Sequence, residues 1–254
     1  MSAGEVMLAS EFVGVYSHAD AVANEISQLT ASGCGVTALL GVLVALRMVD
    51  ASSAIALNWK NCILRQRDLE SPLPDYLLSR SIAGCTAHEL LESMDILVRD
   101  NGLRAVERHF MSYETIKRTH SSISRFISEQ LRNKLCVVAT LNLQLLGNDA
   151  WHHQLVYGVD ECSGDIHCMN PISCYSEEQF NSFLSTPSCL LVRRRDVLDR
   201  IKRTGGSMDI YQQSSWTAFR VQEQIDVLEH DDQCLSHIVI PANYVGGLCM
   251  FSIS

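Results

Sequence analysis

The sequence predicts an α+β protein in which helices come first and an antiparallel sheet follows. Helical periodicity dominates the first half of the chain, and strand-like runs dominate residues 135–170. With 254 residues, 47% hydrophobic and 19% charged, the chain is apolar and long enough to bury a sizeable core. We expect a single domain over residues 1–254, with a core at about 24–195 and a C-terminal extension, 196–254, that closes the sheet.

Four segments of the first half are predicted to be helices. Residues 34–48 form an almost uninterrupted apolar run, which indicates a buried helix. Thr86 and Glu89 have the spacing of a capping box, and Asn101-Gly102 ends the amphipathic pattern that follows them. The other two helical segments are residues 75–82, which follow the break at Ser71-Pro72-Leu73-Pro74, and residues 121–133.

The strands are predicted from runs rich in β-branched and apolar residues. Residues 152–160 and 165–170 flank a short turn segment, so we expect them to pair as a hairpin. Residues 176–185 begin with a serine cap and two glutamates, which predicts a short helix. The remaining predicted strands are residues 135–145, residues 188–194 and two closing strands within 236–254.

The charge and the N-terminal sequence exclude several kinds of partner and compartment. The formal net charge of −9 argues against a nucleic-acid-binding surface and against binding to an anionic membrane. Residues 1–20 lack a basic leader and a long apolar stretch, and the apolar run 36–49 is too short to span a bilayer. We therefore expect a cytoplasmic protein whose ten cysteines are mostly reduced. Nothing in the sequence indicates an oligomeric state.

One group of metal-ligand residue types occurs in the second half, comprising Cys162, His167, Cys168 and Cys174. It lacks the close Cys-x2-Cys pairs of structural zinc sites. His167 and Cys168 are also adjacent on a predicted strand, so their side chains point to opposite faces. We therefore expect no metal site and no organic cofactor.

Cys34 begins the predicted buried helix, where the helix dipole favours the reactive thiolate. A nucleophilic cysteine needs a base, and a further group that orients this base. His152 and His153 are candidate bases on one predicted strand, and Asn170 ends the next strand. Gln28 precedes Cys34 and could donate a hydrogen bond to a developing oxyanion. The parts of a cysteine-based catalytic site are therefore present in a workable order.

Each of these residues also has a purely structural interpretation. Cys34 could be a thiol that packs in the core, and Gln28 a solvated side chain at a helix end. Asn170 precedes a proline, a position where asparagine commonly forms turns. Because successive strand residues face opposite ways, only one of His152 and His153 can point at Cys34.

These residues and their spacing resemble those of papain-like cysteine peptidases, and most closely the double-glycine peptidase domains that process bacteriocin leaders. In those families a glutamine stands six positions before the catalytic cysteine, as Gln28 does before Cys34. The catalytic histidine stands six positions before a strand glycine, as His152 does before Gly158. Asn170, followed by proline, stands where the bacterial group has aspartate and papain has asparagine.

The resemblance covers residues 28–171, over half of the chain, and implies a papain-like fold with its helical part packed on a C-terminal antiparallel sheet. It implies a cytoplasmic thiol protease that hydrolyses a protein or peptide substrate through a Cys-His-Asn triad and a glutamine oxyanion hole. A silent peptide-binding module and an acyltransferase remain open, because transfer and hydrolysis share the acyl-enzyme step. The implied catalytic residues are Cys34, His152, Asn170 and Gln28, with His153 as the alternative base.

The C-terminal region carries a second, weaker resemblance. Residues 238–249 are similar to the end of the eukaryotic actin maturation proteases, which are cysteine peptidases of the same broad class. The polar middle of the extension contains Tyr211, Trp216 and Phe219. We expect residues 196–254 to border the cleft, and their deletion to unfold the chain.

Overall fold

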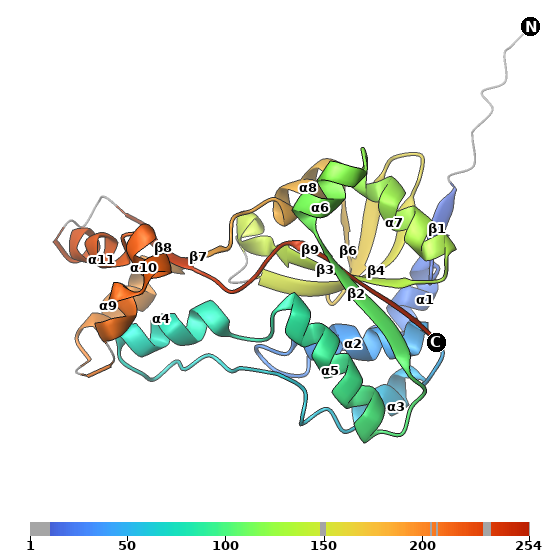
Figure 1. Ribbon diagram of the computed structural model, residues 1–254, viewed down its shortest axis with the longest axis horizontal. Coiled ribbons are helices and arrows are strands. Elements are labelled where there is room, and N and C mark those ends of the chain that lie inside the picture. Colours follow the sequence, from blue (N-terminus) through green and yellow to red (C-terminus); the bar gives the residue numbers. More distant parts are fainter. Residues whose placement is uncertain (1–10, 148–150, 204, 207, 231–234, 254) are drawn as a thin grey trace, which may run out of the picture.

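The computed structural model describes residues 11–147, 151–203, 205–206, 208–230 and 235–253. Its main element is an antiparallel sheet with the strand order β2-β9-β3-β4-β5-β6, to which β1 adds by pairing with β4 (Figure 1). A second sheet consists of β7 and β8. The strands are β1 (Phe12–Gly14), β2 (Val106–Ser112), β3 (Cys136–Asn142), β4 (Trp151–Asp160), β5 (Asp165–Met169), β6 (Ser173–Tyr175), β7 (Cys189–Arg193), β8 (His237–Pro241) and β9 (Gly247–Ile253).

Helices cover both faces of the main sheet and enclose two hydrophobic cores, which confirms the predicted α+β class. In Figure 1, α2 and α5 lie below the sheet, and α6, α7 and α8 lie above it. The helices are α1 (His18–Ala23), α2 (Cys34–Ala45), α3 (Ala51–Ala56), α4 (Leu73–Ile82), α5 (Ala87–Asp100), α6 (Tyr113–Thr119), α7 (Ile123–Arg132), α8 (Glu177–Leu184), α9 (Arg194–Ile201), α10 (Ser214–Ala218) and α11 (Val221–His230), with 3-10 turns η1 (Leu143–Leu146) and η2 (Met208–Gln212).

Strand β3 shows how the sheet separates the two cores. Every residue of β3 is buried. Val138 packs with α2 and α5, whereas its neighbours Val137 and Ala139 pack in the core on the opposite face. This alternation follows from the two-residue period of a strand, and it requires apolar side chains on both faces.

Helix α5 begins and ends at the residues that the sequence predicts. The Thr86 side chain accepts a hydrogen bond from the Glu89 backbone, and the Glu89 carboxylate accepts one from the Thr86 backbone. Asn101 ends the helix, and Gly102 follows it with a left-handed φ of +62°. These contacts confirm the predicted capping box and fix the start of α5 close to Cys85.

The predicted hairpin of β4 and β5 is also confirmed. Leu155 of β4 pairs with Met169 of β5, and the register shifts between Val156 and Gly158. A Cβ at Gly158 would lie 2.0 Å from the Phe12 ring, so glycine leaves room for this side chain of the neighbouring strand β1. The hairpin brings the end of β5, and therefore Asn170, back toward the first part of β4.

The two predicted closing strands exist, but they belong to different sheets. β8 pairs with β7 in the small sheet, whereas β9 lies between β2 and β3 in the main sheet. The sequence did not indicate β2, which is an outer strand in this order with exposed residues after Val106. It also did not indicate α9, α10 and α11.

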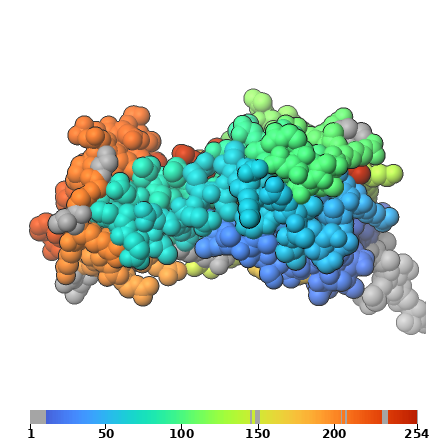
Figure 2. Space-filling view, turned by 90° about the horizontal axis from the view of Figure 1, so that it is seen from below, coloured from blue at the N-terminus to red at the C-terminus, as the bar shows by residue number. Residues whose placement is uncertain are grey.

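These three helices, together with α4, β7 and β8, enclose a third hydrophobic cluster and form a lobe at the left of Figure 1. The space-filling view shows this lobe at one end of an elongated molecule (Figure 2). Trp151, the first residue of β4, packs in this cluster and stacks on Tyr244, with ring centroids 5.7 Å apart. The lobe therefore adjoins the start of β4. Within the described part of the chain, we find no helix that is long and apolar enough to cross a membrane.

Candidate active site

Cys34 is the first residue of α2, a helix that is buried along almost its entire length. Only 8% of Cys34 is exposed. The next residue must be small, because a Cβ at Gly35 would lie 2.5 Å from Sγ of Cys85 and 3.2 Å from Cδ2 of His153. Gly35 therefore allows the first turn of α2 to pack directly against β4 and against the segment before α5.

The surroundings of Cys34 shift the pKa of its thiol in opposing directions. Burial is the main influence and raises the pKa of Cys34, whereas hydrogen bonds from the backbone at His153 and Gly35 and the charge of Arg67 lower it. The helix N-terminus also favours the thiolate. Cys34 is thus a buried thiol beside several groups that stabilise its anion when the anion forms.

His152 is the second residue of β4 and lines the same cavity as Cys34. Its Nδ1 atom is buried and has no hydrogen-bond partner among the residues that the structure describes. Burial, and to a lesser degree the charge of Arg67, lowers the pKa of His152. A buried nitrogen without a partner destabilises the folded state, so its presence calls for a functional explanation.

His153 is not among the described residues that line this cavity, because both of its nitrogens are used in the core. Its Nε2 lies 2.9 Å from the carbonyl oxygen of Cys85, and its Nδ1 lies 3.1 Å from Oγ1 of Thr140. The side chain is only 2% exposed. Burial lowers the pKa of His153 to about 4. The geometry is that of a neutral structural histidine.

Asn170 follows β5 and reaches the N-terminus of α2. Its Nδ2 donates a hydrogen bond of 3.3 Å to the carbonyl oxygen of Cys34. Its φ of +68° lies in the left-handed region, which asparagine tolerates better than most residues. The Nε2 atom of Gln154, on β4, donates a hydrogen bond of 3.3 Å to the Asn170 carbonyl oxygen and so stabilises this turn. The hairpin therefore brings Asn170 to Cys34, although these residues are 136 positions apart.

Gln28 lies in the segment before α2 and lines two cavities. Its Nε2 donates to the carbonyl oxygen of Thr30 at 2.6 Å and to that of Ala31 at 3.1 Å. A glutamine amide has two donor hydrogens, and both are used by these local contacts. Gln28 therefore lines the cavity without presenting an amide donor to Cys34 in this conformation.

Two cavities meet at these residues. The first is lined by Cys34, Gln28 and His152, and the second by Gln28, His152 and Asn170. Gln28 and His152 line both cavities, whereas Cys34 lines only the first and Asn170 only the second.

The first cavity also contains residues that the sequence did not single out. They come from the loop before α4, from α4 and the segment that follows it, from the first residue of β4, and from the C-terminal lobe. Of these residues, only Tyr244 lies within a segment singled out for its own resemblance, namely residues 238–249, which are similar to the end of the actin maturation proteases. These further lining residues include Arg67, Arg80, Cys85, Trp151, Leu190 and Tyr244.

The group considered for zinc is dispersed by the sheet. His167 and Cys174 are cross-strand neighbours, with Nε2 and Sγ 3.8 Å apart. Cys168 instead points into the buried core with α7 and α8. Within the described ranges there is no group of three or more ligand-type residues that could hold a metal ion.

No family model matches the chain, and no curated protein matches it.

Proposed function

We propose that the chain is a papain-like cysteine peptidase that acts on a protein or peptide substrate in the cytoplasm. The observation that carries this proposal is the shared cavity of Cys34 and His152. It combines a thiol at a helix N-terminus with a buried imidazole nitrogen that lacks a partner among the described residues. The nine described cysteines are all free thiols, which supports a reducing compartment.

In the proposed reaction, Sγ of Cys34 attacks the scissile carbonyl carbon while the thiol proton passes to Nδ1 of His152. The carbon–nitrogen bond then breaks, the imidazolium returns the proton to the leaving amine, and a thioester remains on Cys34. Water then attacks the thioester carbon and gives a proton to His152. The carbon–sulfur bond breaks, the acid product leaves, and His152 returns the proton to Sγ of Cys34. Because burial disfavours both charged forms, we expect proton transfer to accompany the attack rather than to precede it.

Two further groups support these steps. The backbone N–H of Cys34 belongs to the first turn of α2, where such groups lack intrahelical acceptors, so we assign it to the oxyanion. Gln28 can join it when its amide turns away from the Thr30 and Ala31 carbonyl oxygens. We assign Asn170 the role of orienting His152, because both line the second cavity.

The second candidate is a peptide-binding module of the same fold without catalysis. Two observations favour it. The structure contains no direct hydrogen bond between the described residues Cys34 and His152, and burial raises the pKa of Cys34 and lowers that of His152, which favours the neutral form of each. An acyltransferase is the third candidate, in which an amine or thiol replaces water in the second step.

A test that separates these candidates is the incubation of the purified full chain with a mixture of peptides, read by mass spectrometry. Hydrolysis yields new free carboxyl termini, and acyl transfer yields adducts with an added amine. We expect Cys34→Ala and His152→Ala to lower cleavage by at least about a thousandfold. Cys174→Ala is the matched control, because Cys174 forms an exposed cysteine–histidine pair with His167 outside these cavities.

The other outcomes are equally informative. Peptides that bind equally well to the wild type and to Cys34→Ala, without cleavage, would establish the binding module. Cleavage that survives in Cys34→Ala would overturn the assignment of the nucleophile. Loss of cleavage in His153→Gln with retention in His152→Ala would move the base by one residue, against the geometry described above.

A further inference from the structure

We propose that the Tyr244 hydroxyl is a catalytic hydrogen-bond donor, which binds the oxyanion that forms when Cys34 attacks the scissile carbonyl group. The inference deepens the proposed peptidase function and depends on it. An oxyanion site needs donors that are fixed before the reaction and are not used in other hydrogen bonds. In this structure Tyr244 meets both conditions, whereas Gln28, which the sequence suggests for this role, does not meet the second.

The first argument is the position of the hydroxyl group. Tyr244 lines the first cavity together with Cys34 and His152. The volume of this cavity is about 40 Å³, which is room for only a few atoms of a substrate. A Cβ at Gly84 would lie 3.7 Å from the Tyr244 hydroxyl and 3.4 Å from the carbonyl oxygen of Ser32. The hydroxyl therefore lies near the segment that leads into Cys34 and α2.

The second argument is that the hydroxyl is available. Tyr244 is only 7% exposed, and no residue within the described ranges forms a hydrogen bond with its hydroxyl. The Gln28 amide, in contrast, donates to the carbonyl oxygens of Thr30 and Ala31. A substrate oxygen that enters the cavity gives the Tyr244 hydroxyl a partner, whereas Gln28 must first break two hydrogen bonds.

The third argument is that the backbone around Tyr244 is fixed. The residue lies in the segment that joins β8 of the small sheet to β9 of the main sheet (Figure 1). Before Tyr244, the N–H of Asn243 donates to the carbonyl oxygen of Ser81 at 3.0 Å. After it, the carbonyl oxygen of Gly246 accepts from the N–H of Tyr113 at 2.9 Å. Hydrogen bonds on both sides therefore stabilise the position of this segment.

The Tyr244 ring is fixed as well. It stacks on the indole ring of Trp151, with an interplanar angle of 18°. The indole Nε1 in turn donates to the carbonyl oxygen of Cys189 at 2.9 Å. Trp151 directly precedes His152 in β4, so one strand positions both the proposed base and the ring that carries the hydroxyl. A donor that is fixed in this way needs no reorganisation when charge develops on the substrate.

The protonation state of the hydroxyl suits a donor. Burial is the main cause that raises the pKa of Tyr244, and the charges of Cys34 and Cys85 raise it further. The charges of Arg67 and Arg65 act in the opposite direction, but more weakly. The hydroxyl therefore stays protonated at neutral pH. Because Cys34 is the first of these charges, its sulfur lies within electrostatic reach of the hydroxyl.

In the proposed step, Sγ of Cys34 forms a bond to the scissile carbonyl carbon, and the π electrons of the carbonyl group move onto its oxygen. The Tyr244 hydroxyl and the backbone N–H of Cys34 donate hydrogen bonds to this oxygen. The electrons then return to restore the carbonyl group as the carbon–nitrogen bond breaks, and the leaving amine takes its proton from His152. Tyr244 keeps its own proton throughout.

The experiment measures kcat and KM of the full chain for a peptide that the wild type cleaves. Tyr244→Phe removes the hydroxyl but retains the ring that stacks on Trp151. We expect it to lower kcat by about a hundredfold or more and to change KM by less than about twofold. Gln28→Ala should lower kcat less. Tyr211→Phe is the matched control, because it removes a hydroxyl from the same lobe but outside both cavities.

Alkylation of Cys34 by iodoacetamide separates an effect on the oxyanion from an effect on the thiol. In this reaction the sulfur displaces iodide, and no oxyanion forms. Tyr244→Phe should therefore be alkylated at Cys34 at the wild-type rate, measured by mass spectrometry. A variant that loses alkylation and cleavage to the same extent would assign Tyr244 to the thiol or to the fold, and would overturn the inference.

A peptide aldehyde with the sequence of the cleaved peptide tests the same contact without turnover. The Cys34 thiol adds to its carbonyl carbon, and the aldehyde oxygen then occupies the place of the oxyanion. We expect Tyr244→Phe to weaken inhibition by the aldehyde by about tenfold or more, and to leave inhibition by the matching peptide alcohol unchanged. Equal losses for the two inhibitors would show that Tyr244 binds the peptide and not the oxyanion.

The outcomes distinguish this inference from the proposed function. If the wild type cleaves peptides and Tyr244→Phe retains the wild-type kcat, the inference is wrong and the peptidase proposal stands. A larger loss of kcat in Gln28→Ala than in Tyr244→Phe would also overturn it, because it would return the role to the glutamine. If the wild type cleaves no peptide, the proposed function fails and this inference fails with it.

Discussion

His153 places its Nε2 atom 2.9 Å from the carbonyl oxygen of Cys85 and thereby ties β4 to the segment that precedes α5. With its Nδ1 atom 3.1 Å from Oγ1 of Thr140, the ring is fully used within the core. Its neighbour His152 has the opposite environment, since its Nδ1 atom is buried without a partner among the described residues. The two adjacent histidines of β4 therefore differ in role: His153 stabilises the fold, whereas His152 faces the cavity of Cys34.

The first prediction concerns the pH dependence of folding. Burial lowers the pKa of His153 from 6.5 to about 4 in the folded chain. Between these values the unfolded chain binds a proton that the folded chain does not, so stability falls as pH falls. This histidine alone should lower the free energy of unfolding by about 3 kcal/mol between pH 7.5 and pH 4.

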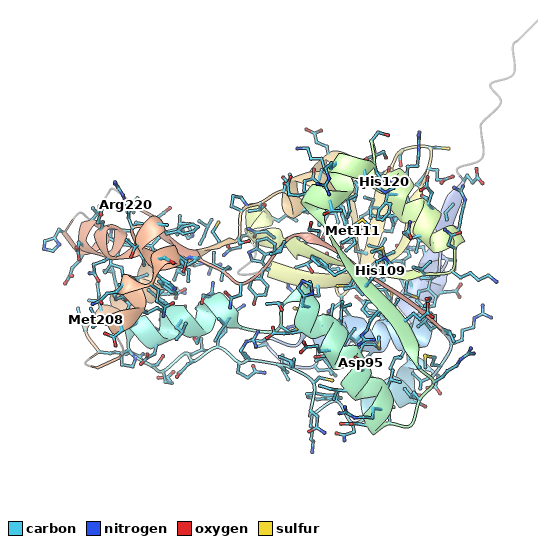
Figure 3. All side chains as sticks on the ribbon, viewed as in Figure 1. Asp95, His109, Met111, His120, Met208 and Arg220 are labelled. Atoms are coloured by element: carbon cyan, nitrogen blue, oxygen red, sulfur yellow. The ribbon has the colours of Figure 1, made fainter. Side chains whose placement is uncertain are left out.

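Urea unfolding at several pH values in this range measures the effect. His153→Gln should be less stable than the wild type at pH 7.5, but its stability should depend less on pH. His109→Gln is the control, because His109 is exposed on β2 (Figure 3). An unchanged pH slope in His153→Gln would show that the ring is not held neutral.

The second prediction concerns the close approach of α2 to its neighbours. A Cβ at Gly35 would lie 2.5 Å from Sγ of the buried Cys85, so Gly35→Ala should destabilise the chain by about 1–3 kcal/mol. The double variant with Cys85→Ala should recover part of this loss, because it removes the sulfur atom that the new methyl group meets. Gly41→Ala, whose nearest atom would be a Leu155 methyl group at 3.2 Å, should cost less. Additive effects of the two substitutions in the double variant would contradict the contact.

The parts of the fold that depend on local sequence were predictable. Helix α2 follows from an unbroken apolar run, and α5 from the capping box of Thr86 and Glu89. In the same way, the pairing of β4 with β5 follows from two apolar runs around a short turn. Each of these signals lies within a few residues of the element that it predicts.

The parts that depend on tertiary contacts were not predictable. β8 and β9 have similar strand-like sequences, and only the packing of distant elements places one with β7 and the other between β2 and β3. Arg67 precedes α4 and Arg80 lies on it, neither within a recognisable motif, and only the folded chain brings both to the wall of the first cavity. The conformation of Gln28 depends on carbonyl oxygens whose positions no spacing rule gives.

The third prediction concerns the ion pair at the start of α5. The two side chains of Arg65 and Glu89 form a bidentate pair and are 31% and 26% exposed. Hydrogen bonds from Arg65 lower the pKa of Glu89 to about 2. A lowered carboxyl pKa contributes stability above pH 4.5, and this contribution is lost as pH falls toward 2.

Glu89→Gln should therefore lower the free energy of unfolding by about 1 kcal/mol at pH 7, a value that allows for partial solvent screening. The difference from the wild type should shrink steadily between pH 4.5 and pH 2.5. Urea unfolding at these pH values measures it, and Glu92→Gln on the exposed side of the same helix is the control. A difference that persists at pH 2.5 would assign the effect to the cap geometry rather than to the charge.

The fourth prediction concerns β9, the last strand of the main sheet in the sequence. It lies between β2 and β3, and its residues Leu248, Cys249, Met250 and Phe251 are all fully buried, facing the two cores in alternation. Deleting residues 246–254 would leave β3 without one neighbour and open both cores. We expect the truncated chain to be insoluble or unfolded by circular dichroism.

Two point variants of β9 test whether this strand is buried in the sheet without shortening the chain. Met250→Asp places a charge in the core with α7 and α8, where an unpaired carboxylate is strongly unfavourable. Ile253→Asp changes the same strand at a residue that is 38% exposed. We expect the first variant to lose its cooperative thermal transition and the second to retain it. If both variants unfold with the same midpoint as the wild type, β9 does not occupy the centre of the sheet in solution.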